Sequence, residues 1–318
     1  MTEVTDDWFA RRTSVWQDWP LDDLLAAKAR SGTTVSLVIP ARNEADTVAD
    51  IVSRVRRDLV ETAGLVDEIV VIDSDSTDAT AELARAAGAV VHRAVDIRPE
   101  LGTMRGKGEA MWKSLFVTTG DVLVFMDADL TEWDTHFVTG MLGPLLLEAD
   151  VDLVKAFYDR PLIQQDGGSS EGGGRVTQLV ARPLLALRWP ELSALIQPLA
   201  GEWAIRRSLF ERLSVPTGYG VELGAVLDTY LLEGLDAIAQ VDLGRRAHSH
   251  QTLRALGGMA LEVLAVADRR AGVPRNEDRV ELRQFEAADG ETIPVSREVA
   301  LTERPPAISV AGAIEEVS

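Results

Sequence analysis

The chain has 318 residues, of which 46% are hydrophobic, so it is long enough to bury the core of one large α/β domain. Its 51 acidic and 32 basic residues give a formal net charge of −19, which disfavours binding to nucleic acid or to an anionic membrane surface. The absence of cysteine excludes disulfides, thiolate metal sites and cysteine nucleophiles.

The N-terminal region has no features of a targeting segment. Residues 1–20 contain Asp6, Asp7, Arg11 and Arg12 and have no long apolar run, unlike a secretory signal peptide. No later stretch reaches the roughly 20 uninterrupted apolar residues that a membrane span requires. Together with the lack of cysteine, these features predict a soluble cytoplasmic protein.

In residues 31–150, short β-branched apolar runs alternate with longer segments of helical spacing. This alternation is typical of a parallel sheet covered by helices. In chain order, it predicts strands at 35–39, 68–72, 89–92 and 122–126, and helices at 43–59, 79–87 and 109–118. Between the third strand and the third helix, residues 98–108 are expected to form a loop that contains glycines and basic residues.

Residues 151–273 are less regular. They predict strands at 153–158 and 236–241, a glycine- and serine-rich loop at 164–174, and helices at 175–186, 224–232 and 253–267. From Pro274 onward, charges and prolines dominate, which indicates an extended tail or a partner-binding arm. We therefore divide the chain into an N-terminal extension (1–30), two subdomains (31–150 and 151–273) and a C-terminal tail (274–318).

Two carboxylates follow the predicted strand 122–126 directly, in Asp127-Ala128-Asp129. In an open α/β sheet, ligands bind where the carboxyl ends of the strands meet. One carboxylate can hold Mg²⁺ or Mn²⁺ at a diphosphate while the other faces a sugar or ribose hydroxyl. The alternative without a function is a strand that ends in a turn-forming pair of aspartates.

Polar residues also follow the first two strands. Pro40-Ala41-Arg42-Asn43-Glu44 can present backbone groups and a carboxylate to a nucleobase and ribose, or it can simply begin a helix that Asn43 caps. In residues 73–78, helix capping explains the last three positions and leaves Asp73 and Ser74 as candidates for nucleotide contact.

Three basic segments are candidates for binding an anion. Lys107 lies between two glycines, so a ligand can approach its backbone closely, although an ordinary surface lysine is commoner. Gly174-Arg175-Val176-Thr177 joins the glycine-rich loop to a helix start, where free N–H groups, a guanidinium and a hydroxyl suit a phosphate, although a plain surface loop is the alternative. Arg245-Arg246 can hold phosphates, and the nearby His248 and His250 are candidate metal ligands or exposed loop histidines.

Taken together, these motifs resemble the actinobacterial glucosyl-3-phosphoglycerate synthases, a family of retaining glycosyltransferases with a GT-A-type fold. The resemblance extends in order and spacing from Val35 to about Gly272. It implies a Rossmann-like, mostly parallel sheet flanked by helices. Residues 31–150 would then bind the nucleotide sugar, and residues 151–273 would bind the acceptor and complete the metal site.

The resemblance also implies roles for individual residues. Asp129 and His248 are expected to bind the metal, and Asp127 and Glu222 are the expected catalytic residues at the sugar. Gly174, Arg175, Val176 and Thr177 are expected to form the 3-phosphoglycerate pocket. Donor contacts are expected from Pro40, Ala41, Arg42, Asn43, Glu44, Ser74, Lys107, Asp127, Ala128, Tyr219, Gly220, Val221, Glu222, Arg246 and His250.

Three positions depart from the family pattern. Ala128 replaces a serine, Trp203 replaces a tyrosine, and His250 stands in place of an asparagine. These changes bear on the choice of acceptor or sugar, but they keep both carboxylates of the expected metal site.

The implied reaction moves glucose from UDP-glucose to the 2-hydroxyl of 3-phosphoglycerate with retention of configuration, and Mg²⁺ or Mn²⁺ is the implied cofactor. Glu222 is not assigned as a covalent nucleophile, because the leaving phosphate can itself take the acceptor proton on the same face. A homodimer is also expected, with the apolar helix 253–267 as a candidate contact.

Three alternatives stay open at this point. The first is mannosyl transfer from GDP-mannose to the same acceptor. The second is a nucleotidyltransferase that makes nucleotide sugars, although Pro40-Ala41-Arg42-Asn43-Glu44 lacks the glycine-rich, lysine-containing phosphate loop expected after the first strand. The third is a non-catalytic nucleotide-sugar-binding protein.

Overall fold

The computed structural model describes residues 3–159, 161–163, 169–171, 174–246, 252–274, 277–288 and 291–310. Its helices are α1 (Glu3–Arg12), α2 (Leu21–Ser31), α3 (Val48–Val55), α4 (Thr80–Ala87), α5 (Lys107–Ser114), α6 (His136–Leu147), α7 (Arg182–Arg188), α8 (Arg207–Phe210), α9 (Val221–Glu233) and α10 (Leu253–Arg270). The central strands are β1 (Thr13–Val15), β2 (Val35–Ala41), β3 (Glu68–Asp73), β4 (Val90–Arg93), β5 (Val122–Phe125), β6 (Leu153–Asp159), β9 (Trp203–Arg206) and β11 (Ile238–Arg245). Separate two-stranded sheets are formed by β7 (Pro161–Ile163) with β8 (Ser169–Glu171), β10 (Val215–Pro216) with β14 (Glu303–Arg304), and β12 (Arg279–Ala288) with β13 (Glu291–Ala300).

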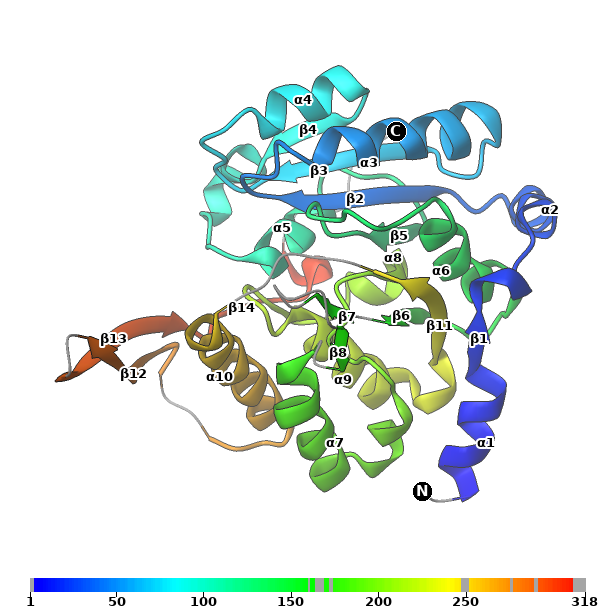
Figure 1. Ribbon diagram of the computed structural model, residues 1–318. Coiled ribbons are helices and arrows are strands. Elements are labelled where there is room, and N and C mark those ends of the chain that lie inside the picture. Colours follow the sequence, from blue (N-terminus) through cyan, green and yellow to red (C-terminus); the bar gives the residue numbers. More distant parts are fainter. Residues whose placement is uncertain are drawn as a thin grey trace.

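The central sheet has the strand order β1-β11-β6-β9-β5-β2-β3-β4 (Figure 1). Strand β9 is antiparallel to both of its neighbours, whereas the other five pairings in this sheet are parallel. The predicted α/β fold with a mostly parallel sheet flanked by helices is therefore confirmed.

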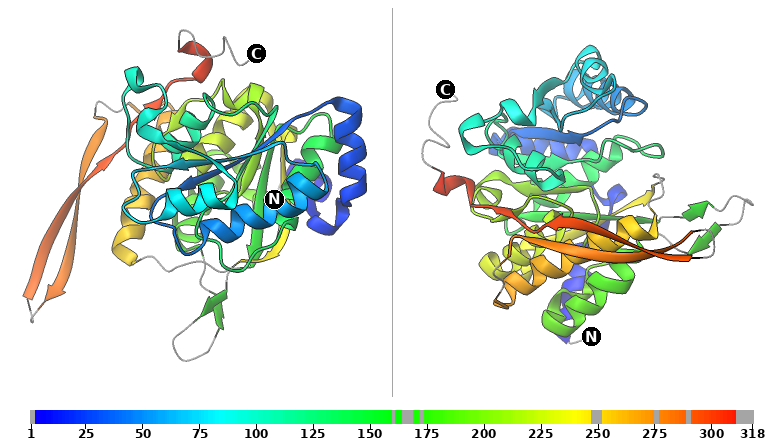
Figure 2. Two further views of the ribbon diagram at one scale, coloured as in Figure 1. Left: turned by 90° about the horizontal axis from the view of Figure 1, so that it is seen from above. Right: turned by 90° about the vertical axis from the view of Figure 1, so that its left-hand side faces the viewer.

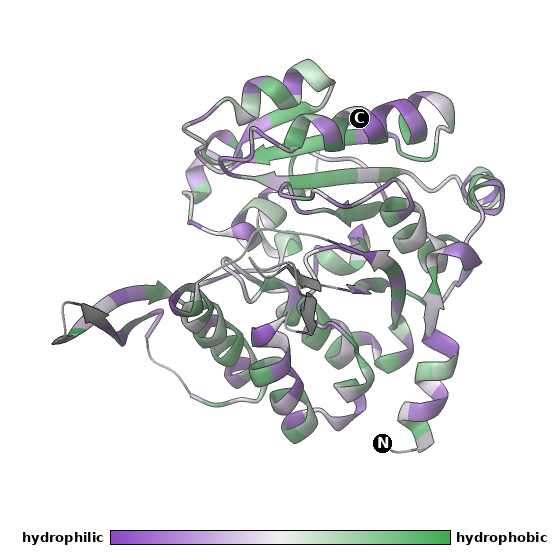
Figure 3. Cartoon of the chain, in the orientation of Figure 1, coloured by the Kyte–Doolittle hydropathy of each residue, from purple (hydrophilic) through white to green (hydrophobic). Residues whose placement is uncertain are grey.

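Both faces of the sheet are buried under helices. Neighbouring residues of one strand enter different cores: Val38 and Phe125 pack on one face, and Leu37 and Val124 on the other. Because a parallel strand covered on both faces needs apolar side chains at successive positions, its sequence is continuously apolar rather than alternating. Figure 3 shows β2 as largely hydrophobic. No described helix is both long and apolar enough to cross a membrane.

Several helices begin or end away from their predicted positions. The helix predicted at 43–59 begins at Val48, since Asn43 has a φ of 57° and starts a turn, and it continues after Val55 as a π-helical turn. The helix predicted at 109–118 begins at Lys107 and ends at Ser114. The helix predicted at 175–186 opens as a π-helical turn at Thr177–Ala181 before α7. Strand β2 continues through Pro40, which pairs with Ile72 of β3.

Described segments near both ends of the chain contribute to the folded body. The N-terminal extension adds β1 to the sheet beside β11, and the buried indole of Trp8 donates to the carbonyls of Leu235 and Ile238. After Pro274, where the sequence indicates an extended tail or arm, β12 and β13 form a hairpin that extends away from the body (Figures 1 and 2). The chain then returns, and β14 pairs with β10.

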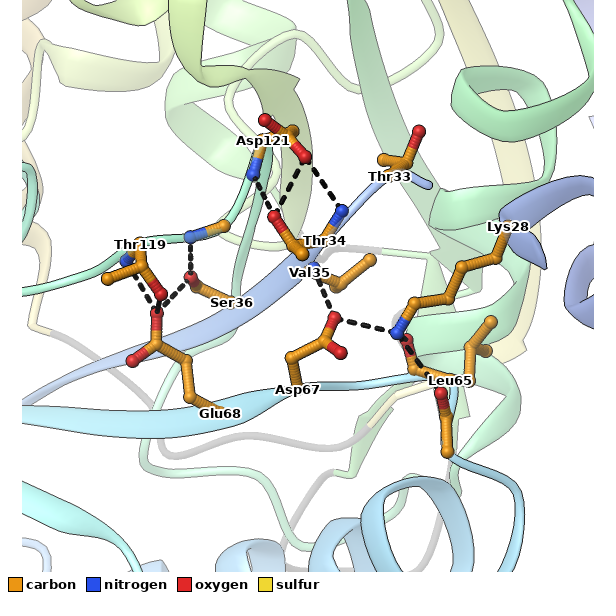
Figure 4. Close-up of polar contacts among 12 residues, drawn as sticks. Lys28, Thr33, Thr34, Val35, Ser36, Leu65, Asp67, Glu68, Thr119 and Asp121 are labelled. Carbon is orange, nitrogen blue, oxygen red and sulfur yellow. Dashed lines mark hydrogen bonds and ion pairs between the residues drawn. The ribbon is translucent and has the colours of Figure 1, made fainter. Parts of the chain in front are cut away.

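At the edge of the sheet where the parallel strands begin, carboxylates fix the strand starts (Figure 4). Asp121 accepts hydrogen bonds from the backbone N–H and the hydroxyl of Thr34, both at 2.8 Å. Glu68 accepts from the Ser36 hydroxyl and from the Thr119 N–H, both at 2.6 Å. These contacts stabilise one edge of the sheet, and the opposite edge, where the strands end, is left for ligands.

Glu68→Ala should lower the free energy of unfolding by about 1–3 kcal/mol, because the buried Ser36 hydroxyl and the Thr119 N–H lose their acceptor. Urea denaturation followed by circular dichroism measures the change. Glu61→Ala is the matched control, since Glu61 forms an exposed ion pair with Arg56 and should change stability by no more than about 0.5 kcal/mol. Equal effects of the two substitutions would contradict this role of Glu68.

Candidate functional site

A cavity of about 870 Å³ lies at the edge of the sheet where the parallel strands end. Strands β2, β3, β5 and β11 lead into it, and the antiparallel β9 begins there. Its wall also includes residues of α10 and of β13. Most of the predicted site residues line it: Pro40, Ala41, Arg42, Glu44, Ser74, Lys107, Asp127, Ala128, Asp129, Gly174, Arg175, Val176, Thr177, Tyr219, Glu222 and Arg246.

Three predicted donor residues are not among the residues that line this cavity. Asn43 turns toward the loop after β3, where its side-chain oxygen accepts from the Thr77 N–H at 2.8 Å. Gly220 faces α10, and a β-carbon there would lie 2.5 Å from Val266. Val221 is buried in the core. The predicted residues His248 and His250 lie outside the described part of the chain.

Asp127 is held between two cations. Its carboxylate lies 2.5 Å from the Lys107 ammonium and 2.7 Å from the Arg246 guanidinium. Burial alone would raise the pKa of Asp127, but the charges of Lys107 and Arg246 outweigh it and hold the pKa below its usual range. Lys107 also lies 2.8 Å from the Glu222 carboxylate. Burial alone would lower the pKa of Lys107, but the charges of Asp127 and Glu222 outweigh it and raise the pKa above its usual value. Asp127 and Lys107 are therefore both charged at neutral pH.

Arg246 links Asp127 to a second buried acid. Its guanidinium lies 3.2 Å from Glu202 and donates to the Tyr158 hydroxyl at 2.9 Å, and that hydroxyl donates to Glu202 at 2.6 Å. The same guanidinium reaches Asp129 at 3.3 Å. Because a planar guanidinium fixes the direction of each hydrogen bond, Arg246 orients both aspartates toward the cavity.

The cavity also contains carboxylates that are not fully neutralised. Burial, followed by the charge of Asp127, raises the pKa of Asp129, and burial together with the charges of Asp129 and Asp127 raises the pKa of Glu44 to about 7. A divalent cation at Asp129 would relieve this repulsion, and carboxylate oxygen suits Mg²⁺ or Mn²⁺. No group of three or more acidic or histidine residues in the described part of the chain is arranged to hold a metal.

The predicted acceptor segment lies on another wall of the cavity. Gly174 has a φ of 76°, and its carbonyl accepts from the Gln178 N–H at 2.9 Å as the helical turn begins. Val176 and Thr177 are buried, and Arg175 also lines the cavity. The glycine thus places a guanidinium, a hydroxyl and the start of a helix beside one another, which suits an anionic group.

Several residues of the site were not found from the sequence. Gly201 lies against Asp127, and a β-carbon at this position would be 2.1 Å from the carboxylate oxygen. Lys155, buried on β6, donates to the Ala200 carbonyl at 2.6 Å, and burial lowers its pKa to about 7. Glu262 on α10 accepts from the Tyr219 N–H at 2.6 Å, and burial raises its pKa to about 7. Glu262 had a signal in the sequence, since it is the one charged residue between Arg254 and Asp268 in an apolar helix.

Two departures from the family pattern now have positions. Trp203 is fully buried and packs against Phe125 and Phe210, so it supports the floor of the site from the core rather than lining the cavity. Ala128 lines the cavity, and its carbonyl accepts from the Thr47 hydroxyl at 2.5 Å.

Known proteins resemble this chain in both sequence and fold. Residues 36–212 match the profile of glycosyl transferase family 2. The glucosyl-3-phosphoglycerate synthase of Mycolicibacterium smegmatis is 47% identical over 288 residues, which cover 91% of this chain and 93% of that protein.

Solved structures of the Mycobacterium tuberculosis glucosyl-3-phosphoglycerate synthase agree with this match. One in complex with Mn²⁺, UDP-glucose and phosphoglyceric acid has a TM-score of 0.80 at 43% identity and covers 91% of this chain and 94% of that one. Another, with Mg²⁺ and UDP, has a TM-score of 0.82 at 43% identity and covers 93% and 97%. The chain therefore belongs to the glucosyl-3-phosphoglycerate synthases, within glycosyl transferase family 2.

Proposed function

We propose that this chain transfers glucose from UDP-glucose to the 2-hydroxyl of 3-phosphoglycerate and retains the configuration of the sugar. One observation carries the proposal: a single cavity brings the Asp127-Ala128-Asp129 strand end together with Lys107, Arg246 and the segment Gly174–Thr177. Relatives that are 40–47% identical over about nine-tenths of this chain are named glucosyl-3-phosphoglycerate synthase, and a solved relative holds both UDP-glucose and phosphoglyceric acid.

The site fits a divalent metal ion. Solved relatives contain Mn²⁺ or Mg²⁺ together with UDP. Asp129 would hold the ion, because it lines the cavity in a surplus of negative charge, and His248 is the proposed second protein ligand. When bound, such an ion supplies charge stabilisation to the leaving diphosphate.

The donor would bind in this cavity. Pro40, Ala41, Arg42 and Glu44 would receive the uridine, and Ser74 lies beside them at the end of β3. Lys107 and Arg246 place positive charge where the diphosphate departs, although the whole chain is strongly acidic. Asp127, kept ionised, and Glu222 would accept hydrogen bonds from glucose hydroxyls.

The acceptor would be oriented by Arg175 and Thr177, which suit the phosphate of 3-phosphoglycerate. In the proposed reaction, the bond between C1 of glucose and the diphosphate oxygen breaks, and a bond from C1 to the acceptor 2-hydroxyl oxygen forms on the same face. The hydroxyl proton passes to the leaving phosphate oxygen. No side chain has to act as a covalent nucleophile, and the enzyme contributes mainly position and charge.

The glucosyl names of the relatives favour glucose over mannose as the transferred sugar. We propose the cytoplasm as the compartment, in keeping with a chain without cysteine. We also propose a homodimer. The helix expected as its contact, α10, lines the cavity and packs Val263 and Ala267 into the core, so the projecting β12–β13 hairpin, with the exposed apolar residues Phe285 and Ile293, is the more suitable contact.

Asp129→Ala should lower the metal-dependent release of UDP about 100-fold or more, because the loss of a metal removes several kcal/mol of charge stabilisation from the transition state. The rate is measured with UDP-glucose and 3-phosphoglycerate over a titration of Mg²⁺ or Mn²⁺. Asp134→Ala, an exposed aspartate outside the cavity lining, is the matched control and should retain activity. Full activity of Asp129→Ala would rule out the metal assignment.

Arg175→Ala should raise the KM for 3-phosphoglycerate about 10- to 100-fold, because a hydrogen-bonded charge facing the phosphate is lost. Calorimetry should find UDP binding nearly unchanged. Arg188→Ala removes a half-exposed guanidinium of α7 that is paired with Asp268 and serves as the control. If UDP affinity collapsed while the KM for 3-phosphoglycerate stayed the same, the acceptor pocket would have been assigned to the wrong wall.

A further inference from the structure

The C-terminal strand β14 lies directly behind the donor side of the cavity. Its residues pair antiparallel with β10, Val215 opposite Arg304 and Pro216 opposite Glu303. Just beyond, the Thr217 N–H donates to the Thr302 carbonyl at 3.1 Å. Thr217 lines the cavity. Residues 302–304 are therefore packed against the residues that lead into Tyr219 and Glu222.

Arg304 of β14 is buried and forms a bidentate ion pair with Glu109 of α5. The two N···O distances are 2.6 and 2.7 Å, and Arg304 and Glu109 are only 6% and 1% exposed. The guanidinium also donates to the carbonyls of Leu101 and Gly102, at 2.8 and 3.0 Å. It lies 4.8 Å from the centre of the Trp112 ring.

These contacts hold the loop of residues 101–106 at its start and in its middle. Arg304 binds the first two carbonyls of the loop, and Glu109 accepts from the Met104 N–H at 3.2 Å. Glu109 and Trp112 lie three residues apart and therefore share one face of α5. Thr103, Met104, Arg105 and Gly106 of this loop line the cavity, and α5 starts at the next residue, Lys107.

The start of α5 has little freedom to move. The Glu109 N–H donates to the Thr217 carbonyl at 3.0 Å. A β-carbon at Gly106 would lie 2.2 Å from that carbonyl oxygen, and one at Gly108 would lie 1.8 Å from the carbonyl oxygen of Pro216. The first turn of the helix is therefore pressed against β10, and the Lys107 ammonium is aimed at Asp127 and Glu222.

The free energy of unfolding alone does not explain why the chain buries this ion pair. A buried ion pair contributes little compared with apolar side chains of the same shape, because both charges lose their hydration. What an apolar pair cannot supply is the set of directed hydrogen bonds to Leu101, Gly102 and Met104. Compared with an apolar pair, Arg304 and Glu109 therefore contribute to the geometry of the loop rather than to the free energy of unfolding.

We propose that Arg304, through Glu109, is a positioning residue for glucosyl transfer: the pair fixes loop 101–106 and the first turn of α5 so that Lys107 is held at Asp127 and Glu222. This inference rests on the proposed function and deepens it. It gives the C-terminal segment a role on the donor side of the reaction, although that segment follows the acceptor-binding part in the sequence.

The test compares Arg304→Met with the double variant Glu109→Met/Arg304→Met in the full chain. Arg304→Met should lower kcat/KM for UDP-glucose about 10- to 100-fold, as expected for a displaced catalytic group, with the KM for 3-phosphoglycerate unchanged. It should also lower Tm, because Glu109 is left buried without its partner. The double variant, which leaves no buried charge, should regain most of the Tm but keep the low kcat/KM. Arg304→Lys, which can make only part of the hydrogen-bond set, should lie in between.

Arg12→Met is the matched control, since Arg12 is as buried as Arg304 and pairs with Glu148 and Asp150 through α1, far along the chain from the donor loop. It should lower Tm without changing kcat/KM. Recovery of kcat/KM together with Tm in the double variant would overturn the proposal, as would an unchanged kcat/KM in Arg304→Met. If the wild-type chain itself did not turn over these substrates, the proposed function would fail. UDP affinity measured by calorimetry would then decide the inference, with about 10-fold weaker binding expected in the double variant and equal binding overturning it.

Discussion

The ionised carboxylate of Asp127, held between the cations of Lys107 and Arg246, is the interaction on which the rest of the site depends. Burial opposes its charge, and two cations are needed to outweigh that cost. Each cation has a further buried partner, Glu222 for Lys107 and Glu202 for Arg246. One carboxylate thereby joins α5, α9, β9 and the end of β11. Because the cations are already fixed in place, an arriving diphosphate meets charges that need little rearrangement.

The topology of the sheet explains how these groups come together. Four parallel strands end at the cavity, and the single antiparallel strand β9 brings its first residues to the same edge. This reversal places the backbone of Gly201 against Asp127, where a side chain would not fit. Residues 215–222 are held by β14, which pairs with β10, and by α10 of the cavity wall, whose Glu262 accepts from the Tyr219 N–H. A chain with a net charge of −19 thus brings Lys107, Arg175 and Arg246 into one cavity beside its carboxylates.

Much of the first half of the fold was predictable, because β2, β3 and β5 are continuous apolar runs that end in polar residues. The same pattern located Asp127, Asp129 and Glu44. What the sequence did not reveal depends on tertiary contact: Glu202 and Lys155 are charged residues whose burial appears only when β6, β9 and β11 lie side by side. The residues after Pro274 have a composition typical of a tail, yet Arg304 is buried. Its partners Glu109 and Leu101 lie about 200 residues earlier in the sequence. Long-range ion pairs of this kind leave no local pattern.

The measurement that tests the central claim most directly is a matrix of donors and acceptors with the purified chain. UDP-glucose, GDP-glucose and GDP-mannose are each combined with 3-phosphoglycerate and with other phosphorylated acids, with and without Mg²⁺, and release of the nucleoside diphosphate is followed. Glucosyl transfer predicts metal-dependent release of UDP from UDP-glucose when 3-phosphoglycerate is present, and much less with every other pair. A preference for GDP-mannose, or no turnover with any pair, would contradict it.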